Sequence, residues 1–371
     1  MDEPKRYESV KQLVGVSKFV LDVAILLFLL SSGWSIRIRS FAQMLSGSNW
    51  LRVMIYMIIV GGLLKGIDLP FSYYSGYVLE HRFQLSRQSF AAWTKDQLKA
   101  LAIAAPLTIA AVEIIYLLLR VDSKFWWVYA STIFIAFAIV MANLAPVLLL
   151  PLFFKFRPVE NPDLQNRVDR LARRTGKRIC GIFEWSLGEK TRKANAAVVG
   201  WGNTRRIIVS DTLLKNFSGE EIEVVMAHEL CHHVKNHIWY GMAAQSIVTF
   251  LAFYAAHLVL PPLSRSFGFS GTEDFANFPL MALVITILSL AALPAVNFFS
   301  RRLETAADLY ALDVTGDALA FVSSMEKLAD INLVNKTPNK IVEFIFHSHP
   351  SVEDRVKLAA DRVGQKCVEE L

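Results

Sequence analysis

The amino-acid sequence predicts an all-α polytopic membrane protein of about six transmembrane helices, joined to a cytoplasmic region that contains a small β-hairpin or sheet. Three observations support this fold class. The chain of 371 residues is 54% hydrophobic and only 19% charged, which is too apolar for an ordinary soluble protein of this length. Six apolar stretches are long enough to cross a bilayer, and the loops between them differ regularly in lysine and arginine content.

Each apolar stretch approaches or exceeds the roughly 20 residues that a helix needs to cross the hydrocarbon core. The stretches lie at 14–34, 52–77, 99–119, 125–152, 239–260 and 277–299. Asp22 interrupts the first, and Lys65 and Asp68 interrupt the second. Charges inside a membrane are costly unless they pair or face water, so we expect Lys65, Asp68 and Glu113 to do one or the other.

The distribution of lysine and arginine predicts which loops face the cytoplasm. Residues 155–235 contain 15 of these residues, and the N-terminal arm and the 80–98 loop are also basic. The positive-inside rule places these segments in the cytoplasm, so both termini share that side with the 155–237 segment. The net charge of +6 is then mainly a signal of topology, and we expect the lipid bilayer and no nucleic acid as a partner.

The sequence HELCH at 228–232 fits the pattern H-E-x-x-H. On a helix, His228 and His232 are one turn apart and share a face, so both imidazoles can reach one Zn²⁺. Glu229 lies beside the first ligand and can take a proton from metal-bound water. Five residues alone are only moderately specific. The alternative is a polar helix end with histidines at the membrane interface.

A zinc site with catalytic activity needs a third protein ligand and an open position for water. After HELCH the chain crosses the membrane twice and returns with NFFSRRLETAADLYALD, which brings Glu304 to the same side and depth as the two histidines. Asp308 lies one helical turn further on the same face, where it can hold a ligating imidazole in the right tautomer. The alternative is a pair of solvated carboxylates balanced by Arg301 and Arg302.

The residues around this pentad are expected to have supporting roles. On a continuous helix His237 faces away from the ligands, so we expect it to orient another group or to lie at the interface. His233 is expected at the surface. Cys231 points about 100° away from His232 around the helix, and we expect it to pack rather than to bind metal.

A β-hairpin is predicted just upstream of the metal-binding helix. Residues 196–201 are small and β-branched, 202–204 resemble a turn, and RRIIVSD resembles a returning strand. An edge strand at this position can pair with an extended peptide and hold one peptide bond over the metal. The candidate substrate-binding residues are Asn195, Ala196 and Ala197. The alternative for Asn195 is that it only starts a turn.

The downstream stretch FHSHPSVEDRVKLAA contains two further catalytic candidates. His349 precedes Pro350, which favours an extended or turn conformation, and a helix is expected to begin near Ser351 or Val352. Arg355 lies on that helix. Peptide hydrolysis passes through a tetrahedral oxyanion, which a positioned histidine or arginine can stabilise. The alternative is a helix cap followed by a surface arginine.

Taken in order, these motifs resemble the integral-membrane zinc CAAX prenyl endopeptidases, gluzincin-type proteases that process prenylated C-termini. The resemblance covers about residues 50–358 and is carried by LEHRFQLSRQSFAAWTKDQLK, APVLLLPLFFKFRP, ANAAVVGWGNTRRIIVSDTLL, HELCHHVKNH, SRRLETAADLYAL and HSHPSVEDR. It implies helices around a membrane chamber that a zinc site closes at its cytoplasmic end.

The resemblance also implies one Zn²⁺ per chain. Its implied ligands are His228, His232 and Glu304, and its implied general base is Glu229. The same matching makes Asn195, His349 and Arg355 substrate or oxyanion groups, with Asp308 supporting a ligand. The chain is shorter than the eukaryotic forms, which favours a prokaryotic homologue in an inner or plasma membrane.

We therefore expect a membrane-embedded zinc metalloendopeptidase that takes peptide or protein substrates, prenylated or otherwise membrane-associated. One alternative is a broad-specificity protease for membrane-protein quality control. Another is a non-proteolytic membrane protein with a structural zinc, although such a site needs four protein ligands. The predicted regions are a four-span region at 1–154, a cytoplasmic protease region at 155–238, a transmembrane hairpin at 239–300 and a cytoplasmic C-terminal region at 301–371.

Overall fold

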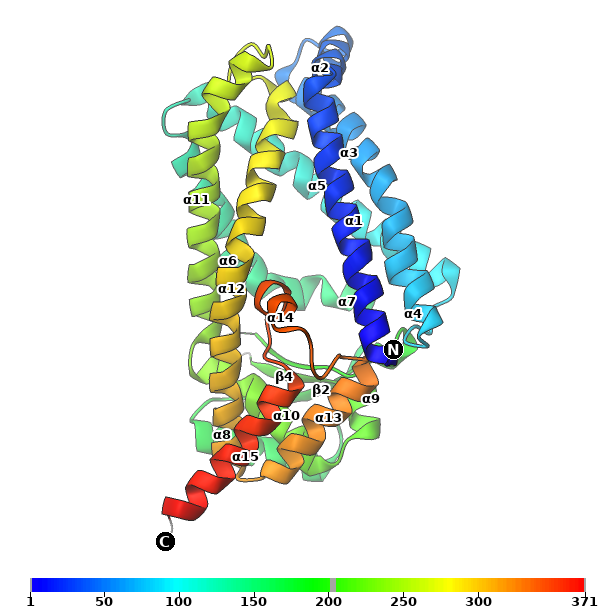
Figure 1. Cartoon of the computed structure of the whole chain (residues 1–371), viewed down its shortest axis with the longest axis vertical. Coiled ribbons are helices and arrows are strands. Elements are labelled where there is room, and N and C mark those ends of the chain that lie inside the picture. The colour runs from blue at the N-terminus through cyan, green and yellow to red at the C-terminus, as the bar shows by residue number, and fades with distance from the viewer. Residues whose placement is uncertain (1, 201–204, 370–371) are drawn as a thin grey trace.

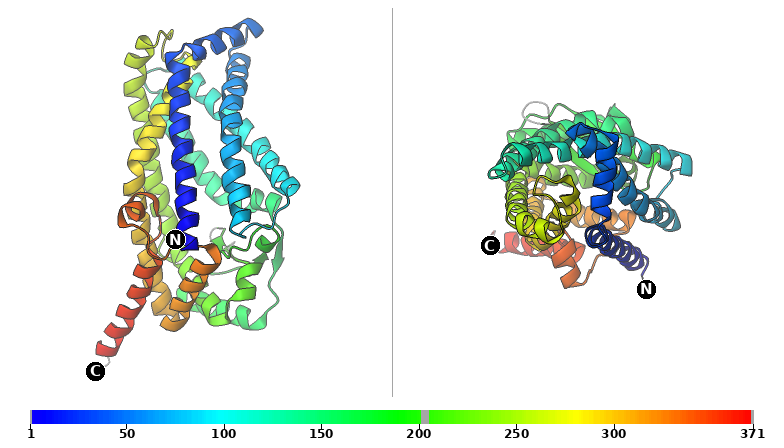
Figure 2. Two further views of the ribbon diagram at one scale, coloured as in Figure 1. Left: turned by 45° about the vertical axis from the view of Figure 1, so that its right-hand side comes forward. Right: turned by 90° about the horizontal axis from the view of Figure 1, so that it is seen from above.

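The computed structural model describes residues 2–200 and 205–369, with side chains through residue 364. Six of its helices are long and apolar enough to cross a membrane: Glu3–Ser31, Asn49–Arg82, Phe90–Val121, Trp126–Phe153, His237–Ser266 and Phe275–Thr315. Each contains most of one predicted stretch, so the six predicted spans are confirmed. Seen from above, the spans do not lie in one flat layer but are distributed around the long axis (Figure 2). The chamber that the resemblance implies stays a prediction.

The N-terminal part of the chain is entirely helical. Its elements are α1 (Glu3–Ser31), α2 (Trp34–Leu45), α3 (Asn49–Tyr73), the π-helical turn η1 (Tyr74–Val78), α4 (Leu79–Arg82), α5 (Phe90–Val121), α6 (Trp126–Leu148) and α7 (Leu150–Phe153). The sequence did not predict α2, which is too short to span a bilayer. It lies across the end of the molecule remote from the sheet (Figure 1), where Ser35 bonds the hydroxyl of Tyr56 at 2.7 Å.

The remaining elements combine a small sheet with helices. They are β1 (Phe156–Pro158), α8 (Pro162–Thr175), β2 (Ile182–Trp185), η2 (Leu187–Glu189), β3 (Ala196–Val199), β4 (Arg206–Ser210), α9 (Asp211–Asn216), α10 (Gly219–Val234), α11 (His237–Ser266), η4 (Phe275–Asn277), α12 (Phe278–Thr315), α13 (Ala318–Asn332), α14 (Lys340–Phe346) and α15 (Val352–Glu369). Helix α12 is continuous over 38 residues and runs from the membrane-spanning part into the region around the sheet (Figure 1).

The predicted hairpin is present as the antiparallel pair of β3 and β4. The turn expected at 202–204 lies outside the described residues. The predicted small sheet extends beyond the hairpin, because β2 pairs in parallel with β4 and β1 pairs antiparallel with β2, which gives the order β1-β2-β4-β3. Strand β3 is therefore an edge strand, and on its outer side Asn332 bonds the main chain of Ala194 while His233 lies 3.0 Å from the carbonyl of Val198.

The charges inside the first two spans pair with one another, as expected. Lys18 of α1 bonds Asp22 at 2.7 Å, and Lys65 of α3 bonds Asp68 at 2.7 Å. A third contact of 3.3 Å joins Lys18 to Asp68 across the two helices. Pairing lowers the cost of placing charged groups at this depth.

Candidate metal centre

Helix α10 carries the HELCH residues and is fixed at both its start and its sides. Its first turn has a capping box, in which Ser218 and Glu221 each accept a hydrogen bond from the other's main-chain N–H. Along the helix, Val224, Ala227 and Leu230 are fully buried in the core between the sheet and the surrounding helices. The buried face fixes the rotation of α10, which sets the direction of His228 and His232.

The three predicted ligands converge. The Nε2 atom of His228 lies 3.2 Å from Oε2 of Glu304, and Nε2 of His232 lies 3.5 Å from Oε1 of the same carboxylate. One ligand atom from each residue lies within 4.8 Å of those of the other two. Glu304 is reached because α12 continues past its span and packs along α10. Two imidazole nitrogens and a carboxylate oxygen suit zinc and leave a fourth position open.

Asp308 fixes the orientation of one ligand. It is fully buried, and its Oδ1 lies 2.8 Å from Nδ1 of His228. A carboxylate at this distance keeps the proton on Nδ1, so Nε2, which faces Glu304, is the nitrogen that can bind an ion once it has lost its proton. The alternative of two solvated carboxylates is therefore wrong, because Glu304 is only 7% exposed and Asp308 is 0% exposed.

Arg355 does not stand free beside the ligands but pairs with Asp308. Its Nε donates to Oδ2 of Asp308 at 2.8 Å, and its Nη2 donates to Oδ1 of the same carboxylate. This two-point contact neutralises a carboxylate that has no access to water. Its proximity to Asp308 raises the pKa of Arg355 against the opposing effect of burial. Helix α15 begins at Val352 as predicted.

The pKa values of the two α10 histidines are shifted in opposite directions, and His228 must release a proton when it binds a cation. Burial, reinforced by the neighbouring His228, lowers the pKa of His232 to about 4, so this imidazole is neutral and can donate a lone pair. Burial disfavours protonation of His228, but hydrogen bonds to Asp308 and Glu304 outweigh it and raise its pKa to about 9. The two carboxylates thus favour positive charge at this point. Burial also raises the pKa of Glu229.

His349 contacts a ligand and also faces solvent. Its Nδ1 lies 2.8 Å from Oε2 of Glu304, while 61% of its side chain is exposed. The segment before it is held by α12, because Asn297 donates to the carbonyl of Ile345 at 2.6 Å and Arg301 donates to that of His347 at 2.6 Å. The sequence does not predict these contacts of Asn297 and Arg301, because no local pattern distinguishes them from other polar residues on α12.

Two histidines next to the ligands differ from expectation. Helix α10 ends at Val234 and Asn236 adopts a left-handed conformation with φ 58°, so α10 and α11 are separate helices. The premise of one continuous helix was wrong, and His237 turns back to place its Nδ1 3.2 Å from Nδ1 of His232. It thus contacts a predicted ligand, in agreement with the expectation that it orients another group. His233 is not a surface residue but is half-buried, with Nε2 3.0 Å from the carbonyl of Val198.

The edge strand β3 has only some of its main chain directed outward. Asn195 exchanges hydrogen bonds with Ser210, whose N–H donates to the Asn195 carbonyl at 2.9 Å. Antiparallel pairs alternate along a strand, so Ala196 directs its N–H and carbonyl away from β4 and Ala197 directs them toward it. Of the three predicted substrate residues, Ala196 offers its main chain, whereas Asn195 and Ala197 offer side chains.

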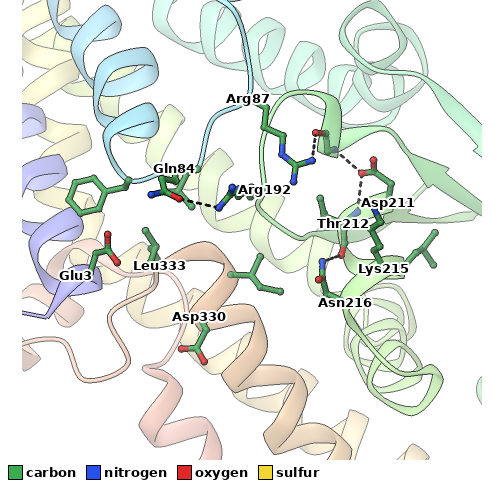
Figure 3. Close-up of a pocket in the computed structure, with 15 residues that line it drawn as sticks. Glu3, Gln84, Arg87, Arg192, Asp211, Thr212, Lys215, Asn216, Asp330 and Leu333 are labelled. Carbon is green, nitrogen blue, oxygen red and sulfur yellow. Dashed lines mark hydrogen bonds between the residues drawn. The ribbon is translucent and has the colours of Figure 1, made fainter.

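A sizeable cavity among the described residues is remote from the predicted ligands. Its volume is about 740 Å³, and it lies between the start of α1, the loop after α4 and helix α9. Figure 3 shows Arg87 and Asp211 in its wall, with Arg87 bonded to the carbonyl of Gly188. Two other cavities adjoin β3. One of about 110 Å³ contains Val198 and His232, and one of about 570 Å³ contains Asn195 and His347.

Comparison with known proteins gives consistent results over nearly the whole chain. Residues 158–363 match the family model of peptidase family M48, and residues 1–155 match a model described as CAAX prenyl protease N-terminal, five membrane helices. An uncharacterized metalloprotease of Bacillus subtilis is 30% identical over 359 residues, which cover 96% of this chain and 84% of that protein. CAAX prenyl protease 1 of Saccharomyces cerevisiae is 29% identical over 333 residues, covering 84% and 72%.

A solved structure shows the same fold. The crystal structure of S. mikatae Ste24p superposes with a TM-score of 0.83 at 24% sequence identity, covering 96% of this chain and 87% of that one. At this identity the match supports the arrangement of helices and sheet. The geometry of the ligands rests on the contacts described above.

Proposed function

Because the chain belongs to peptidase family M48, we propose that it is a zinc endopeptidase whose ion is held by His228, His232 and Glu304. The chain is a membrane metalloprotease with several spans, and it acts on peptide or protein substrates. The observation that carries the proposal is the convergence of these side chains from α10 and α12 within 4.8 Å. These side chains suit one Zn²⁺ per chain, because they combine imidazole and carboxylate groups and leave an open position.

When bound, the ion supplies Lewis acidity toward the peptide carbonyl and toward water. Glu229 accepts the proton of the attacking water and passes it to the leaving amine. The raised pKa of Glu229, caused by burial, makes its carboxylate a stronger base than an exposed one. Asp308 holds the tautomer of His228, and Arg355 supports Asp308.

His349 and Arg355 were both candidates for stabilising the oxyanion, and the contacts favour His349. The guanidinium of Arg355 donates a hydrogen bond to Asp308 at 2.8 Å, and only 13% of the Arg355 side chain is exposed. The imidazole of His349 lies beside Glu304 yet remains largely exposed, so a peptide can approach it. We propose that His349 steadies the oxyanion, while Arg355 acts on the ligands through Asp308.

An extended peptide segment can lie along β3. Ala196 offers a main-chain N–H and carbonyl on the outer edge, and a cavity adjoins each end of the strand. Pairing with an edge strand holds the peptide backbone without selecting its sequence. Asn195, with its main chain engaged by Ser210, is left to contact the peptide through its side-chain amide.

We propose prenylated C-terminal segments as the substrate class, supported by the CAAX prenyl protease name of the Saccharomyces cerevisiae relative. A farnesylated CAAX peptide is expected to show kcat/KM at least about tenfold above that of the same peptide without the lipid, a difference of about 1.4 kcal/mol. An unfolded membrane-protein segment serves as the comparison substrate. Equal cleavage of all three would favour a broad-specificity quality-control protease instead.

We further propose that the end carrying the metal centre faces the cytoplasm of a prokaryotic inner or plasma membrane. Both chain ends lie toward that end (Figure 1), and the basic loops support this orientation. Exposed apolar side chains on α6, such as Phe137, Val140 and Leu144, suit a bilayer.

Cys180 is exposed near the sheet, so a membrane-impermeant thiol reagent is expected to label it only in opened cells. Labelling in intact cells would contradict the orientation.

A further inference from the structure

The first turns of α1 reach both flanks of the peptide site. The start of α1, dark blue in Figure 1, lies beside α4 and close to α13. Tyr7 is buried there and Glu8 is half-buried, although both precede the apolar part of the span. The sequence gives no reason for a helix to bury a tyrosine and a glutamate before it enters the bilayer, so their contacts need an explanation.

Glu8 holds the segment that carries His349. Its Oε1 lies 2.8 Å from Nε2 of His347, and its Oε2 accepts a hydrogen bond from Asn335 at 2.7 Å. His347 is two residues before His349, and its carbonyl is bonded by Arg301 of α12. The turn that presents His349 is therefore fixed from α12 on one side and from α1 on the other.

Tyr7 holds the segment that leads into β3. Its hydroxyl donates to the carboxylate of Glu80, which also bonds Lys193 at 2.8 Å. Lys193 in turn donates to the Tyr7 hydroxyl at 3.2 Å, and the Tyr7 ring packs edge-on against Phe83 with centroids 5.2 Å apart. Because Lys193 is two residues before Asn195, this cluster fixes the start of the edge strand.

A cavity of about 570 Å³ lies between these two contacts. Tyr7 and Glu8 of α1 line it together with Asn195 and His347. Its volume falls within the range of ordinary ligand sites, roughly 300–1,000 Å³. The cavity adjoins the Asn195 end of β3, so a peptide paired with the strand extends into it.

We propose that the first turns of α1 position the peptide site, with Glu8 acting through His347 and Tyr7 acting through Glu80 and Lys193. In this arrangement α1 lines the cavity, and the cavity binds the peptide segment on one side of the scissile bond. The inference rests on the proposed function, because it requires His349 and Asn195 to meet the peptide. Small displacements matter at such sites, since a shift of about 1 Å can cost on the order of a hundredfold in rate.

The two positioning residues are expected to give different kinetic signatures. Glu8→Ala releases the turn before His349 and is expected to lower kcat about tenfold with zinc content unchanged. Glu8→Gln is expected to restore part of the activity, because its single amide oxygen can still accept from His347 while its NH₂ group cannot accept from Asn335. Tyr7→Phe loosens the start of β3 and is expected to raise KM instead. Glu3→Ala removes an exposed carboxylate from the same helix and serves as the matched control.

A double-mutant cycle separates a specific contact from general destabilisation. If Glu8 acts through His347, adding Glu8→Ala to His347→Ala causes little further loss, whereas independent roles give losses that multiply. Full activity in both Glu8→Ala and Tyr7→Phe would overturn the inference. So would a double variant in which the losses of Glu8→Ala and His347→Ala multiply. The proposed function fails by a different result, namely full activity of Glu229→Gln. Zinc stoichiometry and the thermal unfolding midpoint show whether each variant is folded.

Discussion

Replacing Glu229 with glutamine is expected to abolish proteolysis while the metal site stays filled. Glutamine has nearly the same shape as glutamate but cannot accept the proton of the attacking water. Removing a general base costs typically about 10²–10⁴-fold in rate, so cleavage should fall to the background of the assay. The metal ligands are untouched, because Glu229 is not among the three converging side chains. Zinc analysis of the purified variant should therefore match that of the unmodified chain.

Glu220→Gln is a matched control for this experiment. Glu220 lies in the first turn of the same helix, α10, and its exposed carboxylate pairs with Arg167. The chemical change is identical, yet full activity is expected. In cells, comparing the cleaved protein termini produced by the unmodified chain and by Glu229→Gln would identify the native substrates. Undiminished cleavage by Glu229→Gln would remove the role assigned to this residue.

The spans and the pentad could be predicted because their signals are local. An apolar stretch of membrane length and a one-turn spacing of histidines depend only on residues close in sequence. The third ligand followed from topology, because two spans must return the chain to the side from which it left. Glu304 was therefore predictable although it lies far beyond His232 in the sequence.

The contacts that were not predicted depend on features without a local pattern. The break between α10 and α11 occurs at Asn236, whose positive φ is uncommon for a residue other than glycine. This break brings His237 back to His232. The contacts of Glu8 with His347 and of Arg301 with the same segment join distant parts of the chain through single polar side chains. Such pairings become visible only when the helices are placed in space.

Replacing Glu304 with alanine is expected to empty the metal site. The substitution removes one of three ligand groups and leaves two imidazoles, of which His228 then loses its contact of 3.2 Å with that carboxylate. Two protein ligands are too few, because a catalytic zinc site has three protein ligands and one open position. Zinc content should therefore fall far below one equivalent, and proteolysis should be lost with it. Added zinc should restore neither at concentrations that saturate the unmodified chain.

A graded series tests whether the ligand set or the helix packing is responsible. Asp308→Ala leaves all three ligands in place but frees the His228 ring, so metal affinity should fall by about 10–100-fold. Asp313→Ala is the control, because Asp313 also pairs α12 with α15, through Arg362 at 3.0 Å, but in an exposed position. Exposed ion pairs contribute only about 0–1 kcal/mol. Equilibrium titration against a competing chelator should rank the losses as Glu304, then Asp308, then Asp313. A full equivalent of zinc bound by Glu304→Ala would exclude it as a ligand.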